Sequence, residues 1–273
     1  MTSARTSALA SLRGHIERIE SQGGAHALRR AALGHAGADA VLQGGLATGA
    51  VHEVFCEGGR QSAAATGFIA GLAARVAPRR PLVWVRPDFA ERETGALSMS
   101  GLAELGLDPR RLVTVRAPDV ENALRTTADA LACDAVGAVV LEIWGETQKL
   151  DLVASRKLTL AAQDADVTGF LLRIAASPMP STAETRWIVR ASRSPPGSSW
   201  QGWGAPLFDA ELVRNRHGPL GRWIMEWKCD ECLFSEPSAD SQPVAATPAH
   251  RPHQARADLQ NVFKRRAGSA GRQ

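Results

Sequence analysis

The stretch most suggestive of chemistry is Cys56-Glu-Gly-Gly-Arg-Gln-Ser-Ala63, which follows the apolar run Val51 to Phe55 and leads into an alanine-rich segment. A strand, a glycine turn and a helix in that order are typical of a phosphate-binding loop, whose backbone N–H groups face the phosphates. Such a loop also needs a lysine for the β- and γ-phosphates and a Ser or Thr for Mg²⁺. Here the expected Gly-Lys-Thr position contains Gln61-Ser62-Ala63.

The basic residues are unusually biased, with 28 arginines, only 4 lysines and no lysine before Lys149. The stretch therefore has no lysine near it in the sequence. Arg60 could approach a phosphate, but its forked guanidinium is bulkier than the compact ammonium that a phosphate-binding loop uses. Whether this is a working nucleotide loop depends on the elements that position it.

The surrounding sequence alternates short apolar runs with helical patterns. Strands of this kind, separated by helices of about ten to fifteen residues, predict a mostly parallel sheet covered by helices on both faces. The expected strands are 51–55, 81–86, 112–115, 137–144 and 168–174, and the expected helices are 62–76, 94–105, 119–132 and 150–165.

The pattern changes toward the C-terminus, where 185–191, 208–216 and 222–228 alternate apolar and polar residues. They predict antiparallel strands that extend the sheet with one solvated face. Upstream, the spacing of apolar residues in 7–22 predicts an amphipathic helix. We expect three regions: an N-terminal helix and linker at 1–40, a core at 41–234, and a disordered basic tail at 235–273, whose six basic and three acidic residues contribute +3 to the net charge.

Composition excludes several classes of protein. With 44% hydrophobic and 22% charged residues, the chain can bury one full-sized core. We expect a cytoplasmic protein with no membrane contact, because no apolar run approaches about 18 residues and the N-terminus lacks a signal-peptide core. We expect no metal site: Cys229 and Cys232 have metal-ligand spacing but lack a second pair, and we favour reduced thiols.

Three stretches carry a family resemblance. Leu42-Gln-Gly-Gly-Leu-Ala-Thr-Gly-Ala-Val-His-Glu-Val54 resembles the entry into a RecA core, and its pattern Gly-Leu-x-x-Gly-x-Val-His-Glu-Val resembles the ImuA family of bacterial DNA-damage-induced mutagenesis. Ala183-Glu-Thr-Arg-Trp187 and Leu212-Val-Arg-Asn-Arg-His-Gly-Pro-Leu-Gly-Arg-Trp-Ile-Met-Glu-Trp227 are similar to late strands of the same family. The resemblance covers roughly residues 40–230 and implies a RecA-like core.

Compared with an active RecA, this chain departs at the positions that perform catalysis. Glu57 places a carboxylate beside the expected phosphate site, and Ser62 replaces the lysine. Glu142 stands at the position of the Mg²⁺-orienting acid (Walker B), and Asp88 follows the strand that would present a water-activating glutamate. Without the lysine, hydrolysis should be slow or absent. We therefore expect neither catalytic residues nor an ATP cofactor, and we interpret the loop as structural: Glu57, Gly58, Gly59, Arg60, Gln61 and Ser62.

The resemblance implies a non-catalytic adaptor in DNA-damage-induced (SOS) translesion synthesis, associated with the nucleoid when DNA is damaged. The implied partners are an inactive Y-family polymerase homologue of the ImuB type and an error-prone replicative-type DNA polymerase, with RecA as a further candidate. Two alternatives stay open. One is a recombinase-like ATPase that binds nucleotide through Gly58, Gly59, Arg60 and Ser62, and the other is a cell-division inhibitor of the SulA type.

Two segments are candidates for partner or nucleic-acid contact. Trp200 and Trp203 lie in a Gly/Ser/Pro loop after Arg190 and Arg193. They could stack on unpaired bases, anchor a protein partner or cover the sheet edge. In the tail, three apolar residues at helical spacing precede three basic ones, which indicates either a docking peptide or a basic end with salt-sensitive affinity for nucleic acid. These residues are Leu259, Val262, Phe263, Lys264, Arg265 and Arg266.

Overall fold

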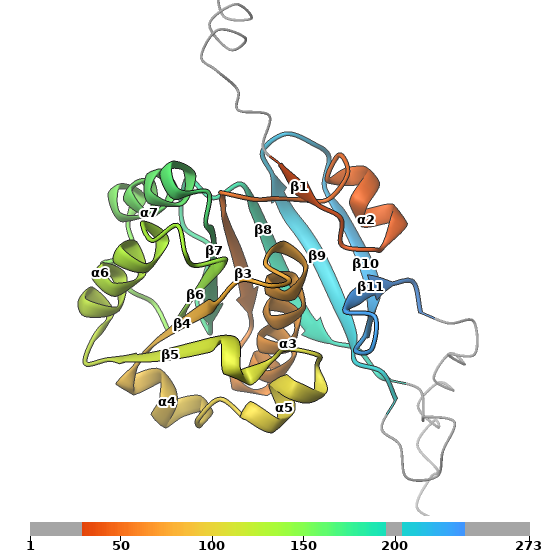
Figure 1. Cartoon of the computed structure of the whole chain (residues 1–273), viewed down its shortest axis with the longest axis horizontal. Coiled ribbons are helices and arrows are strands. Elements are labelled where there is room, and N and C mark those ends of the chain that lie inside the picture. The colour runs from red at the N-terminus through yellow and green to blue at the C-terminus, as the bar shows by residue number, and fades with distance from the viewer. Residues whose placement is uncertain (1–28, 195–203, 238–273) are drawn as a thin grey trace, which may run out of the picture. The chain divides into compact units, whose positions relative to one another are not determined.

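A nine-stranded mixed sheet organises the computed structural model, which describes residues 29–194 and 204–237 (Figure 1). The strand order is β11-β10-β9-β8-β3-β7-β6-β4-β5. The strands from β8 to β5 in this order are parallel, and β9, β10 and β11 continue the sheet in antiparallel pairing. The predicted mostly parallel α/β sheet with antiparallel strands after it is therefore confirmed.

The strand bounds lie close to the expected ones because each strand is an apolar run or an alternating run that ends at a turn. The parallel strands are β3 (Val51–Cys56), β4 (Leu82–Pro87), β5 (Leu112–Ala117), β6 (Ala138–Trp144), β7 (Thr168–Ile174) and β8 (Thr185–Ala191). The antiparallel strands are β9 (Leu207–Asn215), β10 (Gly221–Lys228) and β11 (Leu233–Ser235).

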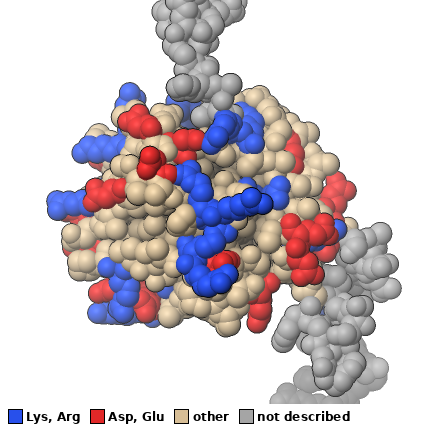
Figure 2. Space-filling model, in the orientation of Figure 1, with Lys and Arg blue, Asp and Glu red and all other residues tan. Residues whose placement is uncertain are grey.

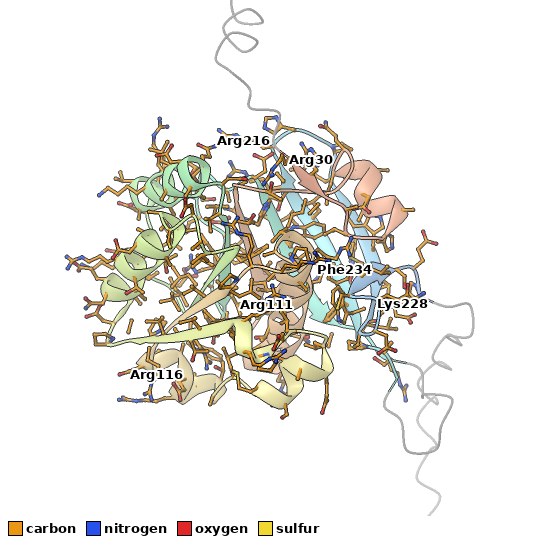
Figure 3. The ribbon with its side chains drawn as sticks, viewed as in Figure 1. Arg30, Arg111, Arg116, Arg216, Lys228 and Phe234 are labelled. Carbon is orange, nitrogen blue, oxygen red and sulfur yellow. The ribbon has the colours of Figure 1, made fainter. Side chains whose placement is uncertain are left out.

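Helices cover both faces of the sheet. Helix α3 (Gly59–Val76) packs on one face, and α6 (Val120–Leu131) and α7 (Leu152–Ala165) pack on the other (Figure 1). The α3 face holds an aromatic cluster that includes Phe234, labelled in Figure 3. Gly71 of α3 permits this close packing, because a Cβ there would lie 2.7 Å from the Phe234 ring and 3.0 Å from Trp227.

The segment before β3 also belongs to the folded body. Strand β1 (Arg30–Ala31) pairs with β2 (Leu46–Ala47), and α2 (Ala36–Val41) lies between them. Leu33 and Ala38 are fully buried, so part of the segment that the sequence assigned to a linker contributes to the core. These elements are too short to show a periodic pattern. The helix expected at 7–22 lies outside the described residues.

The helix expected at 94–105 is wrong as a single element. The chain instead forms α4 (Asp88–Thr94), α5 (Met99–Glu104) and a short 3-10 turn, η1 (Pro109–Arg111). Gly95 ends α4 with φ at 78°, a conformation that favours glycine. Ser98 then caps α5 by accepting a hydrogen bond from the Gly101 N–H. Within the described ranges, no helix is long and apolar enough to cross a bilayer.

Candidate functional site

The C-terminal edge of the parallel strands contains the loop that the sequence analysis compares with a phosphate-binding loop. The chain leaves β3 into α3 on one face of the sheet and leaves β6 into α7 on the opposite face. In open α/β sheets, ligands bind in the crevice that forms outside the strand ends where the chain diverges in this way. This edge is therefore the first place to look for a nucleotide site.

The connection from β3 to α3 is very short. Strand β3 ends at Cys56 and α3 begins at Gly59, so only Glu57 and Gly58 lie between them. A phosphate-binding loop uses a longer run of glycine-rich backbone to surround the phosphates. Gly58 has φ 151° and ψ −171°, in a region that is essentially restricted to glycine. The backbone of the turn itself therefore accounts for one of the two glycines.

The polar side chains of this loop are bonded within the protein. Glu57 forms an ion pair of 3.0 Å with Arg190 of β8, and the Gln61 side-chain oxygen accepts a 2.7 Å hydrogen bond from the N–H of Ala191. The Ser62 hydroxyl donates to the Gly59 carbonyl at 2.7 Å. The first two contacts hold the β3–α3 connection and the first turn of α3 against the end of β8, whereas the Ser62 contact lies within α3. Arg60 is exposed.

An indole ring lies against the start of α3. A Cβ placed on Gly59 would come within 3.0 Å of Cη2 of Trp144, the last residue of β6. Trp144 therefore lies at the C-terminal end of β6, beside the first residue of α3. The second glycine of the loop is explained by this close approach.

Glu142, at the expected Walker B position, is buried and fully engaged. Its Oε2 accepts from Arg86 Nε at 2.8 Å and its Oε1 accepts from Arg86 Nη2 at 3.0 Å. Trp84 Nε1 donates to Oε2 at 3.3 Å, and the Thr94 hydroxyl lies 3.2 Å from Oε1. The Arg86 and Glu142 side chains are only 6% and 2% exposed. A cation at Glu142 would have to displace this arginine.

Asp88 does not join Glu142 at this edge. It is the first residue of α4, and its carboxylate pairs with Arg116 of β5 at 3.2 Å (Arg116 is labelled in Figure 3). Glu91 contacts the same arginine at 2.9 Å. Across the described residues, no group of three or more His, Cys, Asp or Glu side chains is arranged to hold a metal ion.

An apolar pocket beside this edge was not anticipated from the sequence. It has a volume of about 260 Å³ and is lined by Pro87, Phe89, Ala90, Pro118, Asp119, Val120 and Trp144. Phe89, on the first turn of α4, is 53% exposed. An exposed phenylalanine cannot be distinguished from a core phenylalanine by sequence pattern, because both appear as apolar residues near a strand end.

The His52-Glu53 pair of the motif strand β3 is divided between the two faces, as the strand period requires. His52 is fully buried, with Nδ1 2.8 Å from the Thr185 hydroxyl and Nε2 2.8 Å from the Ala47 carbonyl. Burial lowers the pKa of His52 from 6.5 to about 4. Glu53 points to the other face and pairs with Arg186 at 2.7 Å. The motif therefore joins β2, β3 and β8 rather than forming a catalytic pair.

The predicted contact residues are only partly described. Arg190 is engaged by both Glu57 and Glu211, at 3.0 and 3.4 Å, which neutralises its charge locally. Arg193 is exposed after β8. The remaining predicted contacts lie outside the described residues, and their roles stay predictions: Trp200, Trp203, Leu259, Val262, Phe263, Lys264, Arg265 and Arg266.

Two relatives of known name match this chain. Both are called Protein ImuA and come from Caulobacter vibrioides, one from strain NA1000 / CB15N and one from strain ATCC 19089 / CIP 103742 / CB 15. Each is 32% identical to this chain over 197 residues, and the match covers 67% of this chain and 77% of the relative. No family model matches the sequence.

Proposed function

Because this chain belongs to the ImuA family, as its identity to the Caulobacter relatives shows, we propose that it is a non-catalytic RecA-like adaptor in DNA-damage-induced (SOS) translesion synthesis. Its proposed partners are the ImuB-type inactive polymerase homologue and an error-prone replicative-type DNA polymerase. RecA is a further candidate partner. No catalytic residue or ATP cofactor is part of this proposal.

The observation that carries the non-catalytic part is the Arg86–Glu142 pair. The acid at the Walker B position accepts hydrogen bonds on both oxygens from one guanidinium, so its charge is already compensated. The two-residue connection before α3 and the indole beside Gly59 support the same proposal, because a phosphate-binding loop uses a longer glycine-rich connection and an open approach to the start of its helix.

Calorimetric titration of the full chain with ATP and Mg²⁺ tests this part. A lysine-containing RecA core is the positive control, and we expect no heat of binding from this protein. The Ser62→Lys variant sharpens the experiment. If the missing lysine alone prevented binding, the variant would bind ATP. The short connection and Trp144 predict instead that the variant gives no heat of binding. Micromolar binding by the unaltered chain would identify a nucleotide switch instead.

The adaptor part concerns partner surfaces. The pocket beside Phe89 is concave and mostly apolar, and an exposed aromatic at such a pocket is a typical anchor in protein interfaces. We assign it to an apolar side chain of the ImuB-type partner. Capture of the co-expressed polymerase-type partners by the tagged full chain tests the role. Failure to capture either polymerase-type protein would contradict the adaptor function.

The tail can be tested in the same capture experiment. Phe234 is fully buried and β11 extends to Ser235, so the truncation must follow residue 237 to keep the sheet intact. If residues 258–266 form a docking peptide, the 1–237 chain loses one partner and the full chain keeps it. Retention of every partner by the 1–237 chain would exclude the docking peptide.

A further inference from the structure

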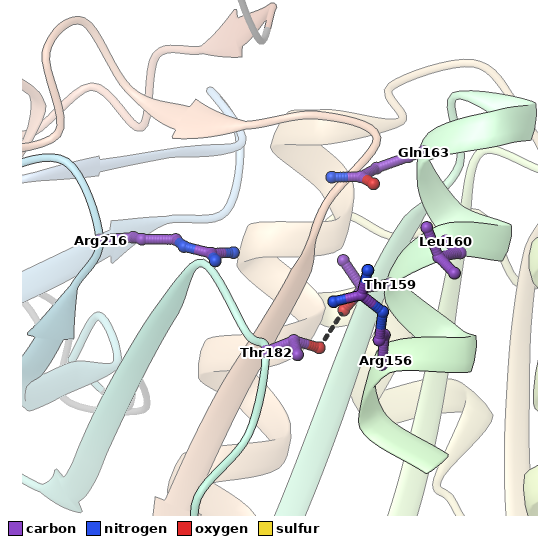
Figure 4. Close-up of a pocket in the computed structure, with 6 residues that line it drawn as sticks. All are labelled: Arg156, Thr159, Leu160, Gln163, Thr182 and Arg216. Atoms are coloured by element: carbon purple, nitrogen blue, oxygen red, sulfur yellow. Dashed lines mark hydrogen bonds between the residues drawn. The ribbon is translucent and has the colours of Figure 1, made fainter. Parts of the chain in front are cut away.

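A second pocket lies on the α7 side of the sheet, where the chain enters β8 and leaves β9 (Figure 4). It has a volume of about 210 Å³. Its lining residues are Arg156, Thr159, Leu160, Gln163, Thr182 and Arg216. They contain two guanidiniums, two hydroxyls and one amide, and none of them is acidic.

The hydroxyls of Ser155, Thr159 and Thr182 at this pocket are hydrogen-bonded to one another. Thr159 donates to the Ser155 carbonyl at 3.1 Å, so its contact of 2.7 Å with Thr182 is donated by Thr182. Ser155 then donates to Thr182 at 3.1 Å and accepts from the Thr182 N–H at 2.9 Å. This network fixes the segment before β8 to α7. Thr159 and Thr182 are therefore held next to each other in the lining of the pocket.

The two arginines of the pocket carry charges that no described side chain compensates. Arg156 and Arg216 are both exposed, and neither forms an ion pair or a side-chain hydrogen bond with the described residues. Figure 4 shows the guanidinium of Arg216 directed across the pocket toward Arg156. Like charges that share a cavity without a carboxylate repel each other, and an anion between them would remove that repulsion.

Arg216 also comes from a motif that the fold explains only in part. In Arg214-Asn215-Arg216, Arg214 donates to the Ser181 carbonyl at 2.9 Å. Asn215 donates to the carbonyls of Val41 and Pro219 at 3.2 and 3.0 Å. These two side chains hold the β9–β10 turn against neighbouring segments. The Arg216 side chain has no such structural contact within the described part of the chain.

We propose that this pocket binds a backbone phosphate of DNA. A guanidinium presents paired N–H donors that match phosphate oxygens, and a cavity of this volume suits a phosphate group better than a whole nucleotide. Lys157, next to Arg156 on α7, is exposed and forms no ion pair with the described residues. Arg30 lies at the same end of the molecule as Arg216 in Figure 3, but its guanidinium donates to two backbone carbonyls of the β1–β2 connection. The three cations around the pocket that have no ion pair among the described residues favour a polymer of phosphates over a single small anion. Choosing DNA over free phosphate rests on the proposed function.

Fluorescence anisotropy with a labelled single-stranded oligonucleotide tests the pocket. The double variant Arg156→Gln/Arg216→Gln keeps a polar, unbranched side chain at each position, although a shorter one, and removes both charges. Its control is Arg92→Gln/Arg125→Gln, which removes two exposed arginines from α4 and α6 and changes the net charge equally. We expect the pocket variant to bind at least about tenfold more weakly and to reduce the slope of log affinity against log salt by about one. The control should change affinity less than about twofold.

Three outcomes would overturn the proposal. Equal losses in both double variants would show that only net charge matters. An unaltered chain that does not bind the oligonucleotide, while inorganic phosphate shifts its melting temperature through Arg156 and Arg216, would assign the pocket to a free anion. Loss of polymerase-type partners by the pocket variant would assign it to an acidic protein surface. Partner capture therefore tests the adaptor function separately from DNA binding. If the pocket binds DNA, the pocket variant should still capture the polymerase-type partners.

Figure 2 shows why the control is needed. Lys and Arg side chains form a band down the middle of the face viewed there, over the region of α3. Arg111 is labelled near the centre of the same view in Figure 3. Its guanidinium is occupied by the carbonyls of Ala77, Pro78 and Arg80, so not every cation of this band is available to a ligand. Nonspecific attraction to this band would affect both double variants alike.

Discussion

The guanidinium of Arg86 on β4 donates to both carboxylate oxygens of Glu142 on β6, at 2.8 and 3.0 Å. The two residues are 56 positions apart in sequence and meet because β4 and β6 are parallel neighbours. Their register places both side chains at the edge where a nucleotide would bind. A position that could orient a metal ion is therefore part of an internal ion pair.

Replacing Arg86 with Met should destabilise the protein by about 3–5 kcal/mol, because it leaves the buried Glu142 charge without a partner. The double variant Arg86→Met/Glu142→Leu should recover most of this loss, since it removes both charges. Urea unfolding of the single and double variants measures the coupling. If Arg86→Met alone lowered the free energy of unfolding by less than about 1 kcal/mol, the Arg86–Glu142 ion pair would not be formed in solution.

The glycine pair of the loop gives a second prediction. Gly58→Ala should cost about 1–3 kcal/mol from backbone strain alone, because φ is 151° and no atom lies within 4 Å of the added Cβ. Gly59→Ala keeps an allowed helical backbone but presses on Trp144, so it should alter tryptophan fluorescence more than stability. Thermal unfolding and emission spectra separate the two effects. A Gly58→Ala variant as stable as the unaltered chain would show that the backbone of the turn can move to a φ that alanine tolerates.

The sequence predicted strands better than it predicted contacts. Strands 168–174 and 185–191 were located without error because an apolar or alternating run is a local signal. The two-residue strands β1 and β2 have no such signal, and Arg30 pairs with Ala47 only when the whole segment folds. The Arg86–Glu142 pair likewise depends on which strands become neighbours, which local patterns do not encode.

Phe89 gives a prediction about partner binding. Phe89→Ala should weaken capture of the ImuB-type partner by at least about tenfold, because truncating a central aromatic anchor of an interface costs about 2 kcal/mol or more. The variant should unfold at nearly the same urea concentration as the unaltered chain, since the ring is 53% exposed. Leu220→Ala is the matched control, as Leu220 is 59% exposed in the β9–β10 turn. Equal capture by both variants would remove the pocket from the interface.

His52 makes stability depend on pH. Burial is the main cause that lowers its pKa to about 4 from 6.5, so between these values the unfolded chain binds a proton that the folded chain does not. Stability from this group is therefore fully present above pH 6.5 and decreases as pH falls toward 4, by up to about 3 kcal/mol. The Nε2–H tautomer fits the contacts: Trp187 donates to Thr185, Thr185 to Nδ1, and Nε2 to the Ala47 carbonyl.

The test is urea unfolding of the unaltered chain and of His52→Gln across pH 5 to 7.5. The variant loses part of the network and should be less stable at pH 7.5, because Gln cannot reach both the Thr185 hydroxyl and the Ala47 carbonyl as the ring does. Since Gln does not titrate, the stability difference between the two proteins should shrink as the pH falls. A difference that stays constant over this range would mean that His52 titrates alike in the folded and unfolded chains, and that its burial is not maintained in solution.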